Sequence, residues 1–381
     1  MSIRVLVIDD SALVRSLLTR ILEKDPQIQV VGSAADPYIA REKIKQLRPD
    51  VLTLDVEMPK MDGITFLQNL MRLHPMPVVM VSSYTEKGAE ITLRALELGA
   101  IDFVSKPQGE LSGSLEMVGE EIIQKVKTAS RANIHAAGRT RPSTPLSVEE
   151  KQSVDSILPG GKKQRPNSAL PPLIAIGAST GGTEAIKDVL LGLPEKMPAI
   201  VITQHIPPGF STAFAKRMDR LAALKVHEAE DAQPIAPGNV YIAPGAQHLL
   251  VTLDNKGYRC KLNDGPRVNR HKPSVDVLFR SVAQTAGRNA TGVILTGMGD
   301  DGARSLLEMR EAGARTIAQD EESSVVWGMP GSAIKRGAAE QILPLEKIPA
   351  ALIYLLAGKG KTLHNTNRLR QRQMAAAASF S

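Results

Sequence analysis

The sequence contains little cysteine and few aromatic residues, and it has no long apolar run. Cys260 is the one cysteine in 381 residues, which excludes an internal disulfide framework. The YRCKL context of Cys260 gives no sign of an activated thiol, so we expect a buried strand position. No apolar run approaches the roughly 18 residues of a membrane helix. The N-terminal MSIRVLVIDD lacks the basic segment and cleavage site of a signal peptide. Together these absences predict a cytoplasmic protein with no direct membrane insertion.

The net charge of +7 invites a nucleic-acid interpretation, which the distribution of the charge disfavours. Much of the excess lies in residues 131–170 and after residue 358, in segments of unstructured composition. Aromatics make up only 3% of the chain, and neither a basic helix with interleaved aromatics nor a helix-turn-helix pattern is present. We therefore predict no nucleic-acid partner, and a positive surface could equally attract an acidic protein.

Residues 1–130 alternate short apolar runs with amphipathic stretches five times. The apolar runs are continuous in Val, Ile and Leu, which is typical of a parallel sheet with helices on both faces. These runs are Val5–Ile8, Val30–Gly32, Val51–Leu54, Val78–Val81 and Asp102–Val104. The pattern predicts a doubly wound α/β domain whose functional residues lie at the carboxyl ends of the strands.

Charged and hydroxyl side chains stand at four of those strand ends. Asp9 and Asp10 end the first strand, Asp55 ends the third, Ser82 the fourth, and Lys106 follows the fifth. Three carboxylates at one sheet edge would repel one another without a cation, so they predict a hard divalent ion, with Mg²⁺ the natural occupant.

A phosphoryl group fits the same edge of the sheet. Asp55 would be its acceptor, Lys106 would pair with the added negative charge, and the Ser82 hydroxyl would hydrogen-bond a phosphoryl oxygen. Two other interpretations are solvated loop carboxylates and a Mg²⁺-dependent phosphatase site. A phosphatase would need a second aspartate just after Asp55, where the chain instead has Val56 and Glu57.

The motifs VLVIDDS, LDVEMPKMDG, VVMVSS and FVSKP resemble the receiver domain of two-component response regulators over about the first 130 residues. The resemblance implies that Asp55 is phosphorylated and that Asp10, Asp55 and the Glu57 carbonyl hold Mg²⁺. It further implies that Asp9 supports the ion through water and that Phe103 is the switch aromatic.

Residues 131–170 have no hydrophobic periodicity and are rich in Pro, Gly, Ser and charge, which predicts a flexible linker with at most a short helix around Val148 to Leu158. The division that follows is a first domain over 1–130, a linker over 131–170, a second domain over 171–357 and a disordered basic tail over 358–381.

In the second domain, strand-like runs resume at Leu173–Gly177, and a turn at Asn255 to Gly257 predicts a β-hairpin inserted in an otherwise mostly parallel α/β domain. The chain is therefore expected to form two doubly wound α/β domains, the second with this insertion.

Three strand ends of the second domain carry a possible nucleophile, base and carboxylate. Ser179 follows the first strand in LIAIGASTGG, His205 follows the second, and Asp300 and Asp301 lie in the glycine-rich GMGDDG after a third. Since the carboxyl ends of parallel strands share one edge, the three groups would meet there. His205 would take the proton of Ser179, and an aspartate would orient the imidazole.

Two rival interpretations concern the same serine. The segment GASTG fits the G-x-S-x-G elbow of α/β-hydrolases, in which case His271 could be the base. No HGGG-type segment precedes the elbow, however, and His271 lies ahead of a helix-like run. A phosphate or nucleotide cradle is the other possibility, but the segment lacks G-x-G-x-x-G and the P-loop lysine.

The second domain as a whole resembles the catalytic domain of the chemotaxis protein-glutamate methylesterases, through IGASTGGTEA, ITQHIPPGF, HKPSVDVLF, LTGMGDDGA and VVWGMPGSA. The resemblance implies that Ser179 is the nucleophile, His205 the base and Asp301 the third catalytic residue. It also implies that amides near Thr180 and Met298 form the oxyanion hole.

The same resemblance implies the reaction and the partners. The enzyme would hydrolyse glutamate γ-methyl esters on methyl-accepting chemotaxis receptors and deamidate receptor glutamines, without a cofactor in the second domain. A chemotaxis histidine kinase would be the phosphodonor, and phosphorylation of Asp55 would relieve blockage of the catalytic cleft. The alternative is a response regulator whose second domain binds a partner and does not catalyse.

Overall fold

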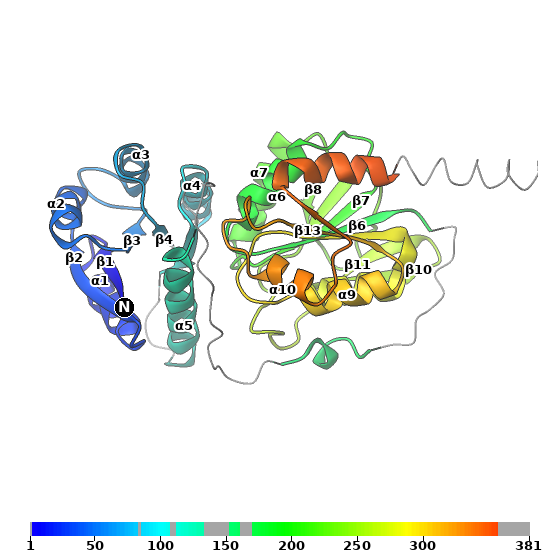
Figure 1. Cartoon of the computed structure of the whole chain (residues 1–381), viewed down its shortest axis with the longest axis horizontal. Coiled ribbons are helices and arrows are strands. Elements are labelled where there is room, and N and C mark those ends of the chain that lie inside the picture. The colour runs from blue at the N-terminus through cyan, green and yellow to red at the C-terminus, as the bar shows by residue number, and fades with distance from the viewer. Residues whose placement is uncertain (1, 83–84, 107–111, 133–151, 161–169, 357–381) are drawn as a thin grey trace, which may run out of the picture.

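The computed structural model describes residues 2–82, 85–106, 112–132, 152–160 and 170–356. Within these residues the chain forms two α/β domains, each built around a mostly parallel sheet with helices on both faces (Figure 1). The predicted fold class is confirmed.

The first domain is a five-stranded parallel sheet in the order β2-β1-β3-β4-β5. Its elements are β1 (Ile3–Ile8), α1 (Ala12–Leu22), β2 (Ile28–Ala34), α2 (Pro37–Leu47), β3 (Val51–Asp55), α3 (Gly63–Leu73), β4 (Val78–Ser82), α4 (Glu86–Glu97), β5 (Asp102–Ser105) and α5 (Ser112–Ala129). Strands β3, β4 and β5 are buried along their whole length, as the continuous apolar runs predicted.

Side-chain caps define where four helices of this domain begin. Ser11, Asp36, Asp62 and Thr85 each have an extended backbone, and each side-chain oxygen accepts a hydrogen bond from an amide of the first helical turn. These bonds satisfy donors that the helix itself cannot, and a cap of this kind contributes about 1 kcal/mol.

The second domain is a seven-stranded parallel sheet in the order β14-β13-β12-β6-β7-β9-β8. Its strands are β6 (Leu173–Ala178), β7 (Ala199–Gln204), β8 (Lys225–Glu228), β9 (Asn239–Ile242), β12 (Ala290–Ile294), β13 (Arg315–Gln319) and β14 (Gln341–Leu343). Its helices are α6 (Gly182–Leu191), α7 (Phe210–Leu221), α8 (Val275–Thr285), α9 (Ala303–Glu311) and α10 (Met329–Lys335), with 3₁₀ turns η2 (Gly287–Asn289) and η3 (Leu345–Lys347) and a helical segment over residues 348–356.

The predicted hairpin is also present. Strands β10 (His248–Asp254) and β11 (Gly257–Asn263) pair antiparallel and form a separate two-stranded sheet. Cys260 lies in β11 and is buried, and burial raises the pKa of its thiol to about 12.

The order of strands in the second sheet decides where its chemistry lies. The chain starts at β6, proceeds to β7 on one side, and later returns to β12 on the other side. The strand order therefore reverses at β6, and open α/β sheets bind their ligands outside the carboxyl ends of the strands at such a point.

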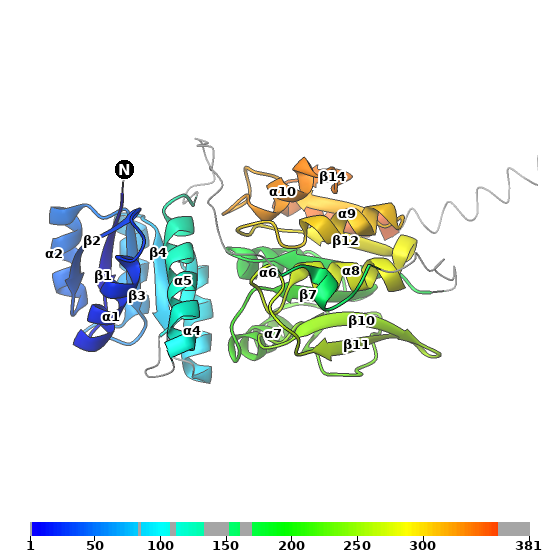
Figure 2. The same ribbon diagram turned by 90° about the horizontal axis from the view of Figure 1, so that it is seen from below.

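Helices α4 and α5 of the first domain lie on the side that faces the second domain, in both views (Figures 1 and 2). Helix α4 packs against α6 and α7 of the second domain. The carboxyl-end loops of the second sheet are thus close to the first domain.

Part of the predicted linker is ordered against the second domain. Residues 152–160 include a 3₁₀ turn, η1 (Val154–Ser156), and Val154 is buried there. The remainder of the linker after residue 132, and the predicted tail over 358–381, lie outside the described residues. In the part of the chain that the structure describes, no helix has the length and apolar character needed to span a membrane.

Candidate active site

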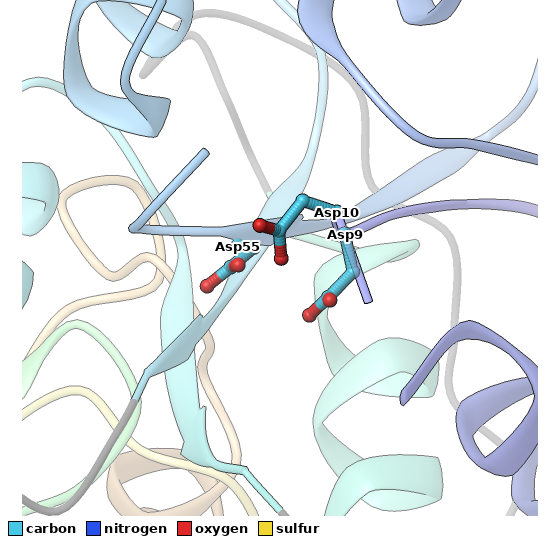
Figure 3. Close-up of side chains that lie close together, drawn as sticks. All are labelled: Asp9, Asp10 and Asp55. Carbon is cyan, nitrogen blue, oxygen red and sulfur yellow. The ribbon is translucent and has the colours of Figure 1, made fainter. Parts of the chain in front are cut away.

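The carboxylates of Asp9, Asp10 and Asp55 gather at the carboxyl edge of the first sheet (Figure 3). Each offers a ligand oxygen, and these oxygens lie within 4.8 Å of one another. Asp9 and Asp55 are buried, whereas Asp10 is exposed. Hard oxygen donors with one open side fit Mg²⁺, which prefers carboxylates and keeps several waters.

Lys106 brings a positive charge to this cluster, with its Nζ 2.7 Å from Asp55 Oδ2 and 3.2 Å from Asp9 Oδ2. Burial, together with the neighbouring charge of Asp9, raises the pKa of Asp55 to about 6 against the opposing hydrogen bond and charge of Lys106. Burial likewise raises the pKa of Asp9. One ammonium does not compensate the cluster, so a divalent cation would favour its ionised form.

The other residues predicted around the phosphoryl group lie near the same edge. The Glu57 amide donates to Asp55 Oδ1 at 3.3 Å, and the Glu57 side chain is exposed. Ser82 is buried, and its hydroxyl donates to the carbonyl of Gly88 in the first turn of α4 at 3.3 Å. Phe103 is buried in β5.

Ser179, His205 and Asp301 are hydrogen-bonded in series at the carboxyl edge of the second sheet. His205 Nδ1 lies 3.1 Å from Ser179 Oγ, and His205 Nε2 lies 2.9 Å from Asp301 Oδ2. Because an ionised Asp301 accepts only, Nε2 carries the ring proton and Nδ1 presents its lone pair to the serine. This arrangement suits an imidazole that accepts the serine proton.

Asp301 is buried and surrounded by hydrogen-bond donors. Its carboxylate accepts from the Val275 amide at 2.6 Å, the Asp276 amide at 3.3 Å and the Ser274 hydroxyl at 2.8 Å. These groups form the N-terminus of α8, where the helix dipole favours an anion. Burial alone would raise the pKa of Asp301, but the hydrogen bond and charge of His205 outweigh it and hold this pKa below its usual range.

Asp276 is a second buried carboxyl beside Asp301. The Asn269 side-chain amide donates to both, at 2.6 Å to Asp276 Oδ2 and 2.8 Å to Asp301 Oδ1. Burial, followed by the charge of Asp301, raises the pKa of Asp276 to about 7. Of the two acids, Asp276 therefore takes up a proton first, and Asp301 stays ionised beside His205.

His271, the alternative candidate for the base, stacks on His205. The rings of His205 and His271 are 3.7 Å apart between centroids and inclined by 12°. Burial, followed by the charge of His205, holds the pKa of His271 well below its usual range. A neutral ring in this position restricts the rotation of His205.

Replacing His271 by Ala is expected to lower kcat about 3- to 10-fold, because a stacked aromatic pair contributes about 0.5–1.5 kcal/mol to the orientation of each ring. His271→Phe keeps a ring on the face of His205 and should retain most of the activity. Initial rates at saturating substrate test this, with the thermal midpoint of each variant as a folding control. Equal activity of the Ala and Phe variants, or loss of activity in both, would contradict a role through stacking.

The turn that carries Ser179 is shaped by two residues that were not singled out from the sequence, Gln204 and Thr296. Gln204 Nε2 donates to the Ser179 carbonyl at 2.9 Å, and the Ser179 amide donates to the Thr296 carbonyl at 3.0 Å. Gly181 has φ +75°, and a Cβ there would lie 2.7 Å from Val325 Cβ, so this turn requires glycine. Gln204 adjoins His205 in sequence, but its role depends on the pairing of β6 with β7, which no single segment reveals.

Both residues predicted at the oxyanion hole touch the first domain. The Thr180 hydroxyl donates to Asp102 Oδ2 at 2.6 Å, and both side chains are buried. The Met298 sulfur accepts a hydrogen bond from the Thr128 hydroxyl of α5. The first domain therefore covers the rim of the cluster formed by Ser179, His205 and Asp301.

Ion pairs and an aromatic contact extend this interdomain contact. Glu97 at the end of α4 pairs with Arg217 of α7 and lies 3.6 Å from Lys187 of α6. The ring of Phe103 lies 4.5 Å from that of Phe210, between centroids. The predicted switch aromatic is thus in contact with the second domain.

Comparison with known proteins gives two family matches. Residues 5–114 match the response regulator receiver domain, and residues 174–352 match the CheB methylesterase family. A protein-glutamate methylesterase/protein-glutamine glutaminase of Hydrogenovibrio crunogenus is 56% identical over 374 residues, which cover 93% of this chain and 99% of the relative. A second relative of that description, from Xanthomonas campestris, is 58% identical over 355 residues, covering 93% of this chain and 98% of the relative. The crystal structure of the Thermotoga maritima CheB methylesterase catalytic domain is 40% identical, with a TM-score of 0.48, over 49% of this chain and 98% of that one.

Proposed function

The chain belongs to the family of protein-glutamate methylesterases/protein-glutamine glutaminases, and on this premise we propose that it hydrolyses γ-methyl esters of glutamate on chemoreceptors. We include deamidation of receptor glutamines, and control of both reactions by phosphorylation of Asp55. The observation that supports the catalytic proposal most directly is the series of hydrogen bonds from Ser179 through His205 to Asp301.

In the proposed reaction Ser179 Oγ attacks the ester carbonyl carbon while its proton passes to His205 Nδ1. The tetrahedral intermediate collapses with cleavage of the C–O bond, and His205 returns the proton to the leaving methanol. Water then attacks the acyl-enzyme by the same proton route and releases the glutamate carboxylate. With a glutamine substrate the C–N bond breaks, and ammonia leaves.

The substrate carbonyl oxygen becomes negatively charged in the tetrahedral intermediate, so hydrogen-bond donors are needed beside Ser179. We propose the backbone amides of Thr180 and Met298 for this role, with the N-terminus of α6, which begins at Gly182, adding a favourable dipole. The loss of one such donor typically lowers kcat about 10²- to 10³-fold.

The interdomain contact supports an inactive state of the unphosphorylated protein. Asp102 is bonded to Thr180 beside the nucleophile, and α5 contacts Met298 through Thr128. A receptor helix would have to displace these contacts to bring an ester to Ser179. We infer that the two domains exist in an equilibrium between this closed arrangement and an open, active one.

Phosphorylation of Asp55 would shift that equilibrium by changing contacts at the carboxyl edge of the first sheet, where the phosphoryl group would lie. Asp10, Asp55 and the Glu57 carbonyl would hold Mg²⁺, with Asp9 supporting the ion through water, and the ion would offset the charge of the carboxylates and of the phosphoryl group. Ser82 would exchange its bond to the α4 carbonyl of Gly88 for one to a phosphoryl oxygen.

Helix α4 carries Glu97 of the interdomain contact, and β5 carries Asp102 and Phe103. Movement of α4 or β5 would therefore weaken the contact between the two domains. In this proposal a chemotaxis histidine kinase supplies the phosphoryl group. A substrate on the receptors' cytoplasmic helices would require the protein to work in the cytoplasm.

The test is methanol release from methylated chemoreceptor membranes, with Mg²⁺ and with or without a small-molecule phosphodonor. Wild-type protein should release methanol and respond to the phosphodonor. Ser179→Ala should lose at least about 10³-fold in rate, because removing a catalytic nucleophile leaves only residual catalysis. Asp55→Ala should keep its basal rate without stimulation.

The catalytic role of Ser179 and the control through Asp55 are each contradicted by a different result. Release that persists in Ser179→Ala would exclude this serine as the nucleophile. Stimulation that survives in Asp55→Ala would exclude control through Asp55. No release from folded, phosphorylated protein would favour a second domain that binds a partner without catalysis.

A further inference from the structure

Residues 152–160, here called the strap, form a small docked element in the middle of the predicted linker (Figure 1, the short green segment between grey traces). Val154 is 2% exposed and packs in a hydrophobic cluster with Leu250, Val268 and Val277. Ile157 and Leu158 add apolar contacts at the rim of that cluster. The strap is therefore anchored by its side chains on the second domain.

A buried arginine of α8 provides the polar anchor of the strap. Arg280 is 2% exposed on its side chain, and its guanidinium binds Glu308 of α9, the carboxylate of Asp155 and the Leu158 carbonyl, the last at 3.0 Å. The hydrogen bond from Ser153 and the one from Arg280 lower the pKa of Asp155 to about 2. Since a buried guanidinium needs these acceptors, loss of the strap would leave Arg280 incompletely paired.

The strap also supports a strained loop. Asn269 and Arg270 adopt φ +50° and +73°, a backbone region that costs a non-glycine residue free energy unless neighbouring contacts fix it. The backbone amide of Asn269 donates to the Gln152 carbonyl of the strap at 3.1 Å, and Val154 packs in the same hydrophobic cluster as Val268. The start of the strap therefore fixes the loop from the side away from the reacting groups.

The other side of this loop reaches the reacting groups. Asn269 Nδ2 donates to Asp301 Oδ1 at 2.8 Å, and His271 stacks on His205 at 3.7 Å. A chain of direct contacts thus runs from Val154 and Gln152, through the loop, to both partners of the His205–Asp301 hydrogen bond.

We propose that the strap is a positioning element of the active site, which holds the 268–271 loop so that Asp301 and His205 keep the geometry in which Nδ1 faces Ser179. The inference rests on the proposed role of Ser179, His205 and Asp301. It makes a segment between the two domains part of the catalytic unit, and the strap acts through Asn269 and His271 without contact to the substrate.

The experiment compares full-length variants by the rate at which Ser179 reacts with a fluorophosphonate. This probe forms an O–P bond to Ser179 Oγ and releases fluoride, and His205 accepts the serine proton, so the readout does not depend on the receptor substrate. Val154→Ser removes the packing on Val268, and Asp155→Ala removes an acceptor of Arg280. Val154→Ile is the conservative variant, and Ser156→Ala, at an exposed strap position, is the matched control.

Labelling is expected to slow about tenfold in Val154→Ser and Asp155→Ala, less than the roughly 10²-fold that a misplacement of about 1 Å can cost, because the strap acts only through the 268–271 loop. Val154→Ile and Ser156→Ala should stay within about twofold of wild type. The low-field proton resonance of His205 Nε2–H, assigned by its loss in His205→Gln, should shift in the two slow variants. Thermal midpoints establish that all variants are folded at the assay temperature.

The proposal is overturned if Val154→Ser and Asp155→Ala lower the thermal midpoint but keep wild-type labelling and an unshifted resonance, because the strap would then only stabilise the fold. Failure of the proposed function is a separate result. If wild type labels at Ser179 but releases no methanol from receptors, the receptor substrate is wrong while the comparison of strap variants still stands.

Discussion

Asp301→Asn is expected to lower kcat about 10⁴-fold, the effect seen when the orienting carboxylate of a serine–histidine pair becomes an amide. Oδ2 of Asp301 accepts from His205 Nε2 and Val275, while Oδ1 accepts from Asn269 and Ser274. An asparagine must turn its NH₂ toward one of these pairs of groups. If it faces His205, the ring accepts there and carries its proton on Nδ1, toward the serine, where it can no longer act as a base.

The neighbouring aspartate supplies the control for this prediction. Asp300 precedes Asp301 and is half-exposed, so Asp300→Asn changes the same charge in the same loop. Its kcat should stay within about threefold of wild type, in line with the small effect of most surface substitutions. Methanol release at saturating substrate measures kcat, and circular dichroism checks the fold. Activity of Asp301→Asn within tenfold of wild type, with an inactive Asp300→Asn, would reverse the assignment of the two aspartates.

Glu97→Lys is expected to raise the activity of the unphosphorylated protein about 5- to 20-fold. It replaces attraction by repulsion against Arg217 and Lys187 in the interdomain contact. The Glu97 side chain is 39% exposed, so solvent screening places the effect at the low end of the 1–3 kcal/mol typical of coupling between sites. The shift favours the open arrangement, and stimulation by a phosphodonor should shrink in proportion.

Two variants make the interpretation of Glu97→Lys specific. In the double variant with Arg217→Glu the charges attract again, and basal activity should fall toward that of wild type. Glu90→Lys changes the same charge on α4, but its pair with Arg220 is about 60% exposed on both sides and 3.9 Å long, so less than a twofold effect is expected. Equal activation by Glu90→Lys and Glu97→Lys would point to a general charge effect and against a specific contact.

Much of the architecture could be predicted because it depends on local patterns. The continuous Val, Ile and Leu runs predicted parallel sheets covered on both faces, and the Asn255 to Gly257 turn predicted the hairpin. Strands β8, β13 and β14 were not identified, since they are short and contain polar residues that only pairing with a neighbouring strand stabilises. The strap was included in a flexible linker because its few apolar residues gain stability only against a surface that the second domain provides.

The sequence by itself determined which groups stand at strand ends, and therefore that Asp9, Asp10, Asp55 and Lys106 meet at one sheet edge and Ser179 and His205 at another. The physical reason is that parallel strands share their carboxyl edge, so position along the chain fixes position in space. Tertiary structure alone decided which aspartate His205 contacts, that His271 stacks on that ring, and that β5 and α5 contact Thr180 and Met298 of the second domain. These features depend on ångström-scale contacts between segments far apart in sequence, which the pattern within any one segment does not specify.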